Sequence, residues 1–326
     1  MEDKSKIIKE FIFSDERPFK SCHASTLVAL ADGSVLAAWF GGSREGAEDV
    51  AIWFSKRIGG RWSFPVKVAD EEGIPHWNPV LFQADSGKTF LFYKVGHTIP
   101  KWHTRFIISE DGGDTWSQPK PLVEGDIGGR GPVKNKPIKL YDDTWIAPAS
   151  IEGDYWDAFV DISYDEGKTW IKSSVVPVEH RGTSFKGKGV IQPTLWESEP
   201  GIVHMLLRST DGYIYRSDSK DGGKTWCPAY RTCLPNNNSG IDLVRLDNGT
   251  LALVYNPVGQ NWGPRTPLVL STSTDNGQTW RQVCVLEDEE GEYSYPAIIK
   301  AGDQIMITYT WKRERIAFWA IPISKL

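Results

Sequence analysis

Hydrophobic residues in this chain fall in short runs that alternate with turns. Between residues 80 and 123 these runs cover residues 80–83, 89–93, 105–109 and 119–123, with Gly, Asp or Pro nearby. Runs of this length, rich in β-branched and aromatic residues, are typical of β-strands. No long segment carries the 3.6-residue apolar period of an amphipathic helix. The pattern therefore predicts an all-β fold built from four-stranded antiparallel units.

One kind of strand recurs six times along the chain. Each copy is a short apolar strand that a small residue or a proline introduces, and successive copies lie 47 to 58 residues apart. A repeat of this length marks a propeller or a solenoid, so six copies predict six blades. The six copies are anchored on Ser25, Pro79, Pro137, Pro193, Gly240 and Pro296.

The last repeat is one strand short. It offers strands at residues 295–300, 305–311 and 316–323, after which the chain ends at residue 326. An apolar run at residues 7–13 precedes the first repeat. We expect this run to supply the missing outer strand, because a closed ring leaves no long strand edge exposed. Residues 1–326 then form a single propeller domain.

A second motif, S-x-D-x-G-x-T-W, interleaves with the first repeat. It occupies residues 109–116, 163–170, 219–226 and 273–280, and a degraded copy, SKRIGGRW, occupies residues 55–62. Asp and Gly at these offsets predict a tight turn, since Asp bonds nearby backbone N–H groups and Gly supplies a positive φ. The motif is similar to the Asp-box of the sialidase-like β-propellers. That resemblance covers nearly the whole chain, and it implies a six-bladed β-propeller whose Asp-box carboxylates are structural.

Composition and charge argue against several function classes. The net charge of −5 implies no basic surface for nucleic acid. No apolar run reaches the length of a membrane span, and the N-terminus shows no signal-peptide region. The four cysteines lack metal-ligand spacing. We therefore expect a cytoplasmic protein with no metal or cofactor, while its oligomeric state stays open.

The propeller resemblance implies where chemistry would lie. Residues that enter the innermost strands, and the loops between second and third strands, rim one mouth of the central channel. Cations there suit an anionic ligand, and aromatic faces suit a sugar ring. Glu152 and residues 311–315 reach the same mouth without an assigned role. The substrate-binding candidates are Arg44, Trp77, Asn78, Asn135, Lys136, Gln192, Arg208, Asn238, Trp262, Arg265 and Tyr293.

Sialidases hold the substrate carboxylate with three arginines, and the resemblance matches two of them here. Arg208 lies in Leu-Arg-Ser at the end of a strand, and Arg265 precedes Thr-Pro-Leu. His23, in His-Ala-Ser-Thr-Leu, stands where the first arginine would be. The exchange removes a permanent cation and adds a titratable group.

The other catalytic positions of the family are partly changed. Tyr295, in Tyr-Pro-Ala-Ile, matches the nucleophilic tyrosine, with Tyr293 as a nearby rival. The glutamate that helps to activate this tyrosine falls at Gln192, which cannot act as a base. The acid/base aspartate falls at or beside Arg44, with Glu45 next to it.

These residues predict a glycoside hydrolase of the exo-sialidase kind, acting on a terminal acidic sugar of a glycan. Arg208 and Arg265 would bind the sugar carboxylate through bidentate hydrogen bonds. Glu45 would be the general acid, and Tyr295 would be the nucleophile or would stabilise oxocarbenium charge. His23 would be a base or an orienting group.

Two alternatives stay open. A lyase would use His23 or Tyr295 to abstract the C5 proton of a uronate while Arg208, Arg265 or Lys136 neutralises the carboxylate. Related propellers include hydrolases and lyases that act on rhamnose-capped glucuronate through a histidine. The other alternative is a glycan-binding propeller without turnover, since the changed positions are what loss of activity would produce.

Overall fold

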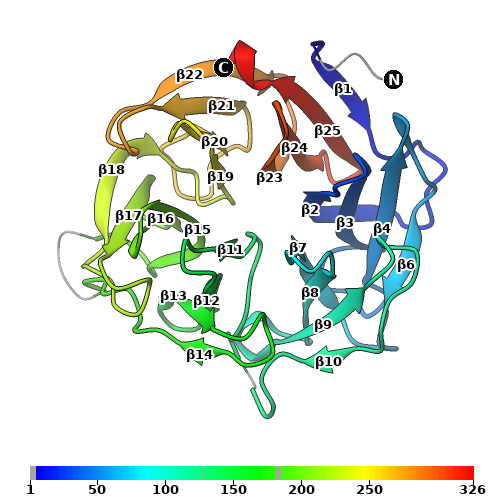
Figure 1. Cartoon of the computed structure of the whole chain (residues 1–326), viewed down its shortest axis with the longest axis horizontal. Helices are drawn as coiled ribbons and strands as arrows, with labels where there is room; N and C mark the ends of the chain where they lie inside the picture. Colours follow the sequence, from blue (N-terminus) through cyan, green and yellow to red (C-terminus); the bar gives the residue numbers. More distant parts are fainter. Residues whose placement is uncertain (1–4, 127, 181–184) are drawn as a thin grey trace.

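The computed structural model describes residues 5–126, 128–180 and 185–326. Its strands form six antiparallel sheets arranged as blades around a central axis (Figure 1). The predicted six-bladed all-β propeller is confirmed. The described helices are the two short 3₁₀ turns η1 (Ile99–Lys101) and η2 (Ile323–Lys325), and no helix in these ranges is long and apolar enough to cross a membrane.

The first three blades follow one another around the ring. The first contains β2 (Ser21–Ala29), β3 (Val35–Gly42), β4 (Ala51–Ile58), β5 (Arg61–Trp62) and β6 (Val66–Ala69). The second contains β7 (His76–Gln83), β8 (Thr89–Val95), β9 (His103–Ser109) and β10 (Lys120–Pro121). The third contains β11 (Ile138–Lys139), β12 (Trp145–Glu152), β13 (Trp156–Ser163) and β14 (Ile171–Lys172).

The remaining blades complete the circle. The fourth contains β15 (Val190–Glu199), β16 (Ile202–Ser209), β17 (Tyr213–Ser219) and β18 (Tyr230–Pro235). The fifth contains β19 (Asp242–Arg245), β20 (Leu251–Tyr255), β21 (Leu268–Ser273) and β22 (Arg281–Glu287). The sixth contains β23 (Tyr293–Ala301), β24 (Gln304–Trp311), β25 (Arg315–Pro322) and the N-terminal β1 (Ile8–Phe11).

Ring closure by the N-terminal segment is confirmed. β1 pairs antiparallel with β25, from Ile8 opposite Ala320 to Phe11 opposite Ala317, and Figure 1 shows the two strands side by side. The next residue continues the contact, since Ile12 N donates to Ile316 O at 2.9 Å. The first and last segments of the chain thus share one blade, which removes a free sheet edge.

The first blade departs from the four-strand pattern because its outer strand is in two pieces. Both β5 and β6 pair with β4, and residues 63–65 separate them. Pro65 lies in this gap and has no N–H to donate to a ladder. The degraded Asp-box therefore coincides with the irregular blade.

The intact Asp-boxes share one set of hydrogen bonds within the turn. In the copy at residues 109–116, Ser109 Oγ donates to Asp111 Oδ1 at 2.8 Å and accepts from Gly113 N at 2.7 Å. Thr115 donates to Asp111 through its N–H and its hydroxyl. Gly113 has a φ of 90°, and a Cβ there would lie 2.6 Å from Phe54 of the preceding blade. The glycine is therefore required both by its conformation and by close packing.

The degraded copy serves a different purpose. Arg57 stands at the Asp position of the motif and donates to Glu10 Oε1 of β1 at 2.7 Å. Trp62, the closing tryptophan, donates to the same carboxylate oxygen at 2.8 Å. Loss of the Asp-box at this blade therefore supplies a clamp on the strand that closes the ring.

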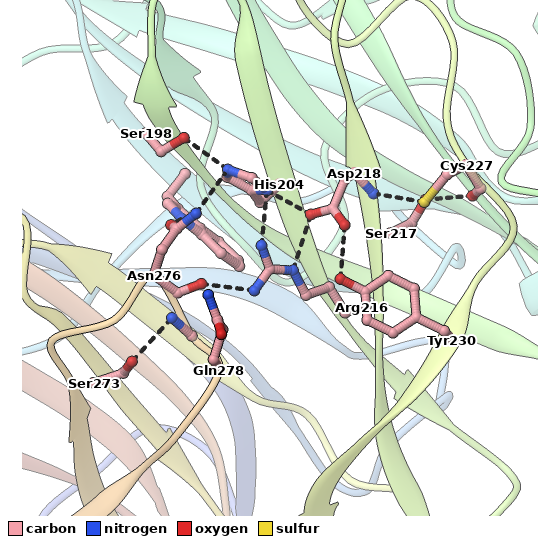
Figure 2. A network of polar contacts seen from close by, with 12 residues as sticks. Ser198, His204, Arg216, Ser217, Asp218, Cys227, Tyr230, Ser273, Asn276 and Gln278 are labelled. Carbon is pink, nitrogen blue, oxygen red and sulfur yellow. Dashed lines mark hydrogen bonds and ion pairs between the residues drawn. The ribbon is translucent and has the colours of Figure 1, made fainter.

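A polar network joins the fourth blade to the Asp-box of the fifth (Figure 2). Asn276 Oδ1 accepts from Trp196 Nε1 at 2.7 Å, and Asn276 O accepts from Arg216 Nη1 at 2.6 Å. His204 lies between Ser198 and Asp218, with its Nε2 at 2.8 Å from Ser198 Oγ and its Nδ1 at 2.5 Å from Asp218 Oδ1. Asn276 Nδ2 also lies 3.2 Å from His204 Nε2, so the imidazole is part of the polar network that joins the two blades.

Candidate active site at the channel mouth

The mouth is built on a backbone feature that recurs in every blade. At or just before each inner strand lies one non-glycine residue with a positive φ, and in four blades a register irregularity of the strand pair accompanies it. This conformation costs roughly 1–3 kcal/mol for a residue with a side chain, and such residues cluster at functional sites. The six residues are Ala24, Asn78, Lys134, Gln192, Asn238 and Tyr295.

Arg208 is the centre of the side-chain cluster at this mouth. It is the second-to-last residue of β16, is 3% exposed, and donates from Nε to Asn238 Oδ1 at 2.7 Å. Its Nη1 donates to Tyr295 Oη at 2.8 Å and to Gln192 Oε1 at 3.1 Å. Gln192 Nε2 also donates to Tyr295 Oη, at 3.3 Å. Three of the residues with positive φ therefore bind one guanidinium, and the phenolic oxygen of Tyr295 accepts from two donors.

His23 lies beside Tyr295 in the buried part of the mouth. It is 1% exposed, and its ring centroid lies 4.2 Å from that of Tyr295. Its Nδ1 is hydrogen-bonded to Thr310 Oγ1 at 2.9 Å. Burial lowers the pKa of His23 well below its usual value, and the charges of Arg313, Arg265 and other nearby cations lower it further. The imidazole is therefore neutral at neutral pH.

Two more arginines, Arg265 and Arg313, lie close to this buried cluster. The guanidinium of Arg265 lies 5.6 Å from the Tyr295 ring centroid and donates to Glu292 Oε1 at 2.7 Å. Arg313, in the turn between β24 and β25, donates to the same Glu292 oxygen at 2.7 Å. Burial alone would raise the pKa of Glu292, but these two charges outweigh it and lower the pKa. With Arg208 they form a cluster of three arginines near Tyr295 and His23, although His23 occupies the expected position of one.

Glu45 and Arg44 lie on the outer part of the mouth. Glu45 is in the loop after β3, its side chain is 43% exposed, and its Oε2 accepts from Arg313 Nη1 at 2.7 Å. Arg44 is exposed, and its side chain has no partner in the described part of the chain. The ring of Trp77 supports this loop, since a Cβ on Gly46 would lie 2.9 Å from it. Asn78, next to Trp77, is buried.

The aromatic rings form a wall beside Arg208. The buried Trp156 and the exposed Trp262 lie 5.6 and 5.7 Å from its guanidinium. Trp262 is 63% exposed, so its face is open to a ligand. Tyr293 lies in the core instead: it is fully buried, and its ring packs against Trp311. The structure therefore brings Trp262, but not Tyr293, to the open side of the cluster.

Two further candidates, Asn135 and Lys136, form hydrogen bonds with groups of other blades. Asn135 Nδ2 donates to Gln192 O and to Pro193 O, both at 3.0 Å. Lys136 Nζ donates to Asp242 Oδ2 at 2.8 Å and to Leu243 O at 2.9 Å. Because these groups are engaged with protein partners, the structure does not bring them into the cluster around Arg208. Their contact with a substrate stays a prediction.

Sequence reasoning assigned no role to three residues that the geometry singles out. Arg313 and Glu292 lie 21 residues apart, and no sequence motif signals their ion pair. Trp156 has no local sequence signal either, because its contact with Arg208 joins two blades. Among the described residues, no group of three or more His, Cys, Asp and Glu side chains could hold a metal ion.

Comparison with known proteins supports this architecture. Residues 33–307 match the family model described as BNR repeat-like domain. A search of curated proteins gave no match. Among solved structures, the Hadza microbial sialidase Hz136 superposes with a TM-score of 0.81 at 17% identity, covering 98% of this chain and 69% of that one.

Two further structures resemble the chain to a similar degree. A protein of unknown function from Dyadobacter fermentans has a TM-score of 0.75 at 16% identity, covering 96% of this chain and 98% of that one. The NanB sialidase from Streptococcus pneumoniae has a TM-score of 0.75 at 15% identity, covering 97% and 71%. At these identities the likeness concerns the fold alone.

Proposed function

The chain belongs to the BNR repeat-like domain family, and from that premise we propose that it is a glycoside hydrolase that releases a terminal acidic sugar, of the sialic or uronic acid type, from a glycan. The family's propeller fold is shared with sialidases. The acidic sugar is inferred from the chain's own residues.

The observation that carries this proposal is the state of Arg208. Its guanidinium is buried, yet its hydrogen bonds go to the neutral side chains of Asn238, Gln192 and Tyr295, and no carboxylate forms an ion pair with it in the described part of the chain. A buried charge without a counter-ion is costly. Its Nη2 has no described protein partner. A ligand carboxylate would supply the missing charge and accept from this nitrogen.

The neighbouring residues suit the chemistry of a sugar acid. Arg265 and Arg313 share Glu292, so the cluster of three arginines keeps an excess of positive charge. The phenolic oxygen of Tyr295 accepts hydrogen bonds from Arg208 and Gln192, and we expect it to attack the anomeric carbon or to stabilise positive charge there. Trp262 offers an exposed ring face for the adjoining sugar.

A panel of fluorogenic glycosides tests the proposal. The purified protein is incubated with 4-methylumbelliferyl α-N-acetylneuraminide, both anomers of the glucuronide, and the corresponding neutral galactosides and glucosides. We expect release of methylumbelliferone from an acidic glycoside only. Turnover of a neutral sugar, or of none of the panel, would contradict the proposal.

His23 favours one alternative, a lyase that acts on a uronate. Its neutral imidazole lies against Tyr295, and Gln192 replaces the glutamate that a tyrosine-based hydrolase would use. A neutral imidazole can accept the C5 proton of a uronate whose carboxylate is neutralised by arginine. The product decides between the two reactions, because only a lyase leaves an unsaturated sugar that absorbs in the ultraviolet.

A further inference from the structure

Three glutamates approach the channel mouth, and their surroundings differ. Glu45 is bound by Arg313, and Glu292 is bound by both Arg265 and Arg313. A carboxylate in an ion pair carries no proton to give. Glu152 differs from both, because its carboxyl group has no hydrogen bond or ion pair to any described residue. A mouth with three acids thus contains one without a partner.

Glu152 also has the right place in the fold. It is the last residue of β12 and lies opposite Trp156 of β13. The Trp156 ring in turn contacts the guanidinium of Arg208 at 5.6 Å. Glu152 therefore stands on the blade next to the proposed carboxylate site and on the same side of the ring as Tyr295.

The environment of Glu152 favours the protonated form. The side chain is half-buried, and this burial raises the pKa of its carboxyl group; the charges of Arg208 and Lys94 oppose the effect only in part. The charge of Glu45 raises the pKa further. Pairs of carboxyl groups held in different protonation states by their surroundings are how many active sites divide acid and base roles.

We propose that Glu152, and not Glu45, is the proton donor of this site. The inference rests on the proposed hydrolase function. The Glu152 carboxyl proton passes to the glycosidic oxygen as the bond from that oxygen to the anomeric carbon breaks, and the bonding pair leaves with the alcohol. Water then adds to the anomeric carbon and gives its proton to the Glu152 carboxylate, which restores the acid.

The test compares two leaving groups on one acidic sugar. The wild type, Glu152→Gln and Glu45→Gln are assayed with the 4-nitrophenyl glycoside, whose phenolate leaves unaided, and with the unactivated methyl glycoside. Glu152→Gln should lose about 10²–10⁴-fold in kcat/KM on the methyl glycoside, the usual range for general acid catalysis, and less than about tenfold on the 4-nitrophenyl glycoside. It should also lose the basic limb of the pH profile.

The matched variant and a binding measurement complete the design. Glu45→Gln frees Arg313 and should change both substrates by the same factor. Glu152→Gln should keep its melting temperature and bind the free sugar acid as the wild type does, since a neutral amide replaces a neutral acid. Tighter binding would mean that Glu152 is ionised, which overturns the inference.

The remaining outcomes separate this inference from the function on which it rests. Equal losses on both glycosides in Glu152→Gln, or a leaving-group effect in Glu45→Gln instead, would overturn the role of Glu152 and leave the hydrolase intact. A wild type that hydrolyses neither glycoside contradicts the proposed function and the proton donor together.

Discussion

The two ends of the propeller use the same backbone conformation in different ways. In the Asp-box turns, two successive residues have a positive φ, and glycine fills the second position in all four intact copies. At the channel mouth, the six residues at or just before the inner strands have a positive φ, and none of these six is glycine. The turns are nearly identical, whereas the six mouth residues all differ except for the two asparagines.

The difference shows which repeats encode the fold and which positions carry function. An Asp-box satisfies its own hydrogen bonds, so one sequence serves in four blades. The mouth residues bind across blades, as Arg208 binds Asn238, Gln192 and Tyr295. Backbone strain at such positions is tolerated where the side chain contributes something that glycine cannot. Changes at the mouth should therefore affect activity, and changes in the boxes should affect stability.

The largest expected effect is at the mouth. Tyr295→Phe keeps the ring against His23 but removes the oxygen that accepts from Arg208 and Gln192. We expect a loss of about 10²–10⁴-fold in kcat, comparable to removal of a general acid or base. The melting temperature should change little, because Arg208 Nη1 keeps Gln192 as a partner. Full activity in this variant would place the chemistry elsewhere.

The matching substitution in an Asp-box is Ser219→Ala, in the fourth blade. Ser219 is buried, donates to Asp221 Oδ1 at 2.7 Å and accepts from Gly223 N at 2.9 Å. Its removal leaves a buried N–H without a partner, which should lower the free energy of unfolding by about 1–3 kcal/mol. Urea unfolding measures this loss, while kcat stays at the wild-type value. A fall in kcat without loss of stability would break the division between the two ends.

The fold was readable from the sequence because both repeats are local. The six copies of the inner strand predicted the number of blades, and the absent outer strand of the last repeat identified residues 7–13 as its replacement. The split outer strand of the first blade was not foreseen, although Pro65 and Arg57 mark the place.

The site was only partly readable. Arg208 and Tyr295 were placed by motif, and the structure brings them together. The pairing of Arg313 with Glu45 joins residues 268 apart in the chain, and no local pattern encodes it. Lys136 was expected at the mouth because it precedes an inner strand, but its ammonium group pairs with Asp242 of the fifth blade, two blades further along the chain. Charge type alone does not say which cations the fold leaves open.

As the pH falls, the Asp-box turns should lose stability before the channel mouth does. Hydrogen bonds from the hydroxyl and the N–H of Thr115 lower the pKa of Asp111 to about 2. In Asp165 and Asp221 burial acts in the opposite direction, yet the corresponding threonine bonds outweigh it and lower the pKa. Because the folded-state pKa lies below the unfolded value of 3.8, this stability is present above about pH 4 and is lost as pH falls through about 2.

Melting temperatures between pH 5 and pH 2 measure this loss. Thr115→Val, which removes one of the donors to Asp111, should flatten the pH dependence. An unchanged slope would show that the boxes contribute no proton-linked stability.

The smallest effects concern the two boxes that lack a first glycine. Glu166 has a φ of 57° and is exposed, so Glu166→Gly should relieve strain and raise stability by less than about 1 kcal/mol. Asn276 has the same φ, but its side chain binds Trp196 across the blade interface. Asn276→Gly should lower stability by about 1 kcal/mol. Thermal unfolding of both variants shows whether each change raises or lowers stability. If both change stability in the same direction, the Asn276 side chain does not hold the two blades together.

The most direct test of the account is calorimetric titration of the wild type and Arg208→Ala with a sialic or uronic acid and with its carboxyl-reduced counterpart. We expect the wild type to bind the acid and not the reduced sugar. We also expect Arg208→Ala to weaken binding of the acid by about 1.5–3 kcal/mol, the range for hydrogen bonds to charged groups. Equal binding of the acid and the reduced sugar by the wild type would contradict the claim that Arg208 binds the carboxylate of the ligand.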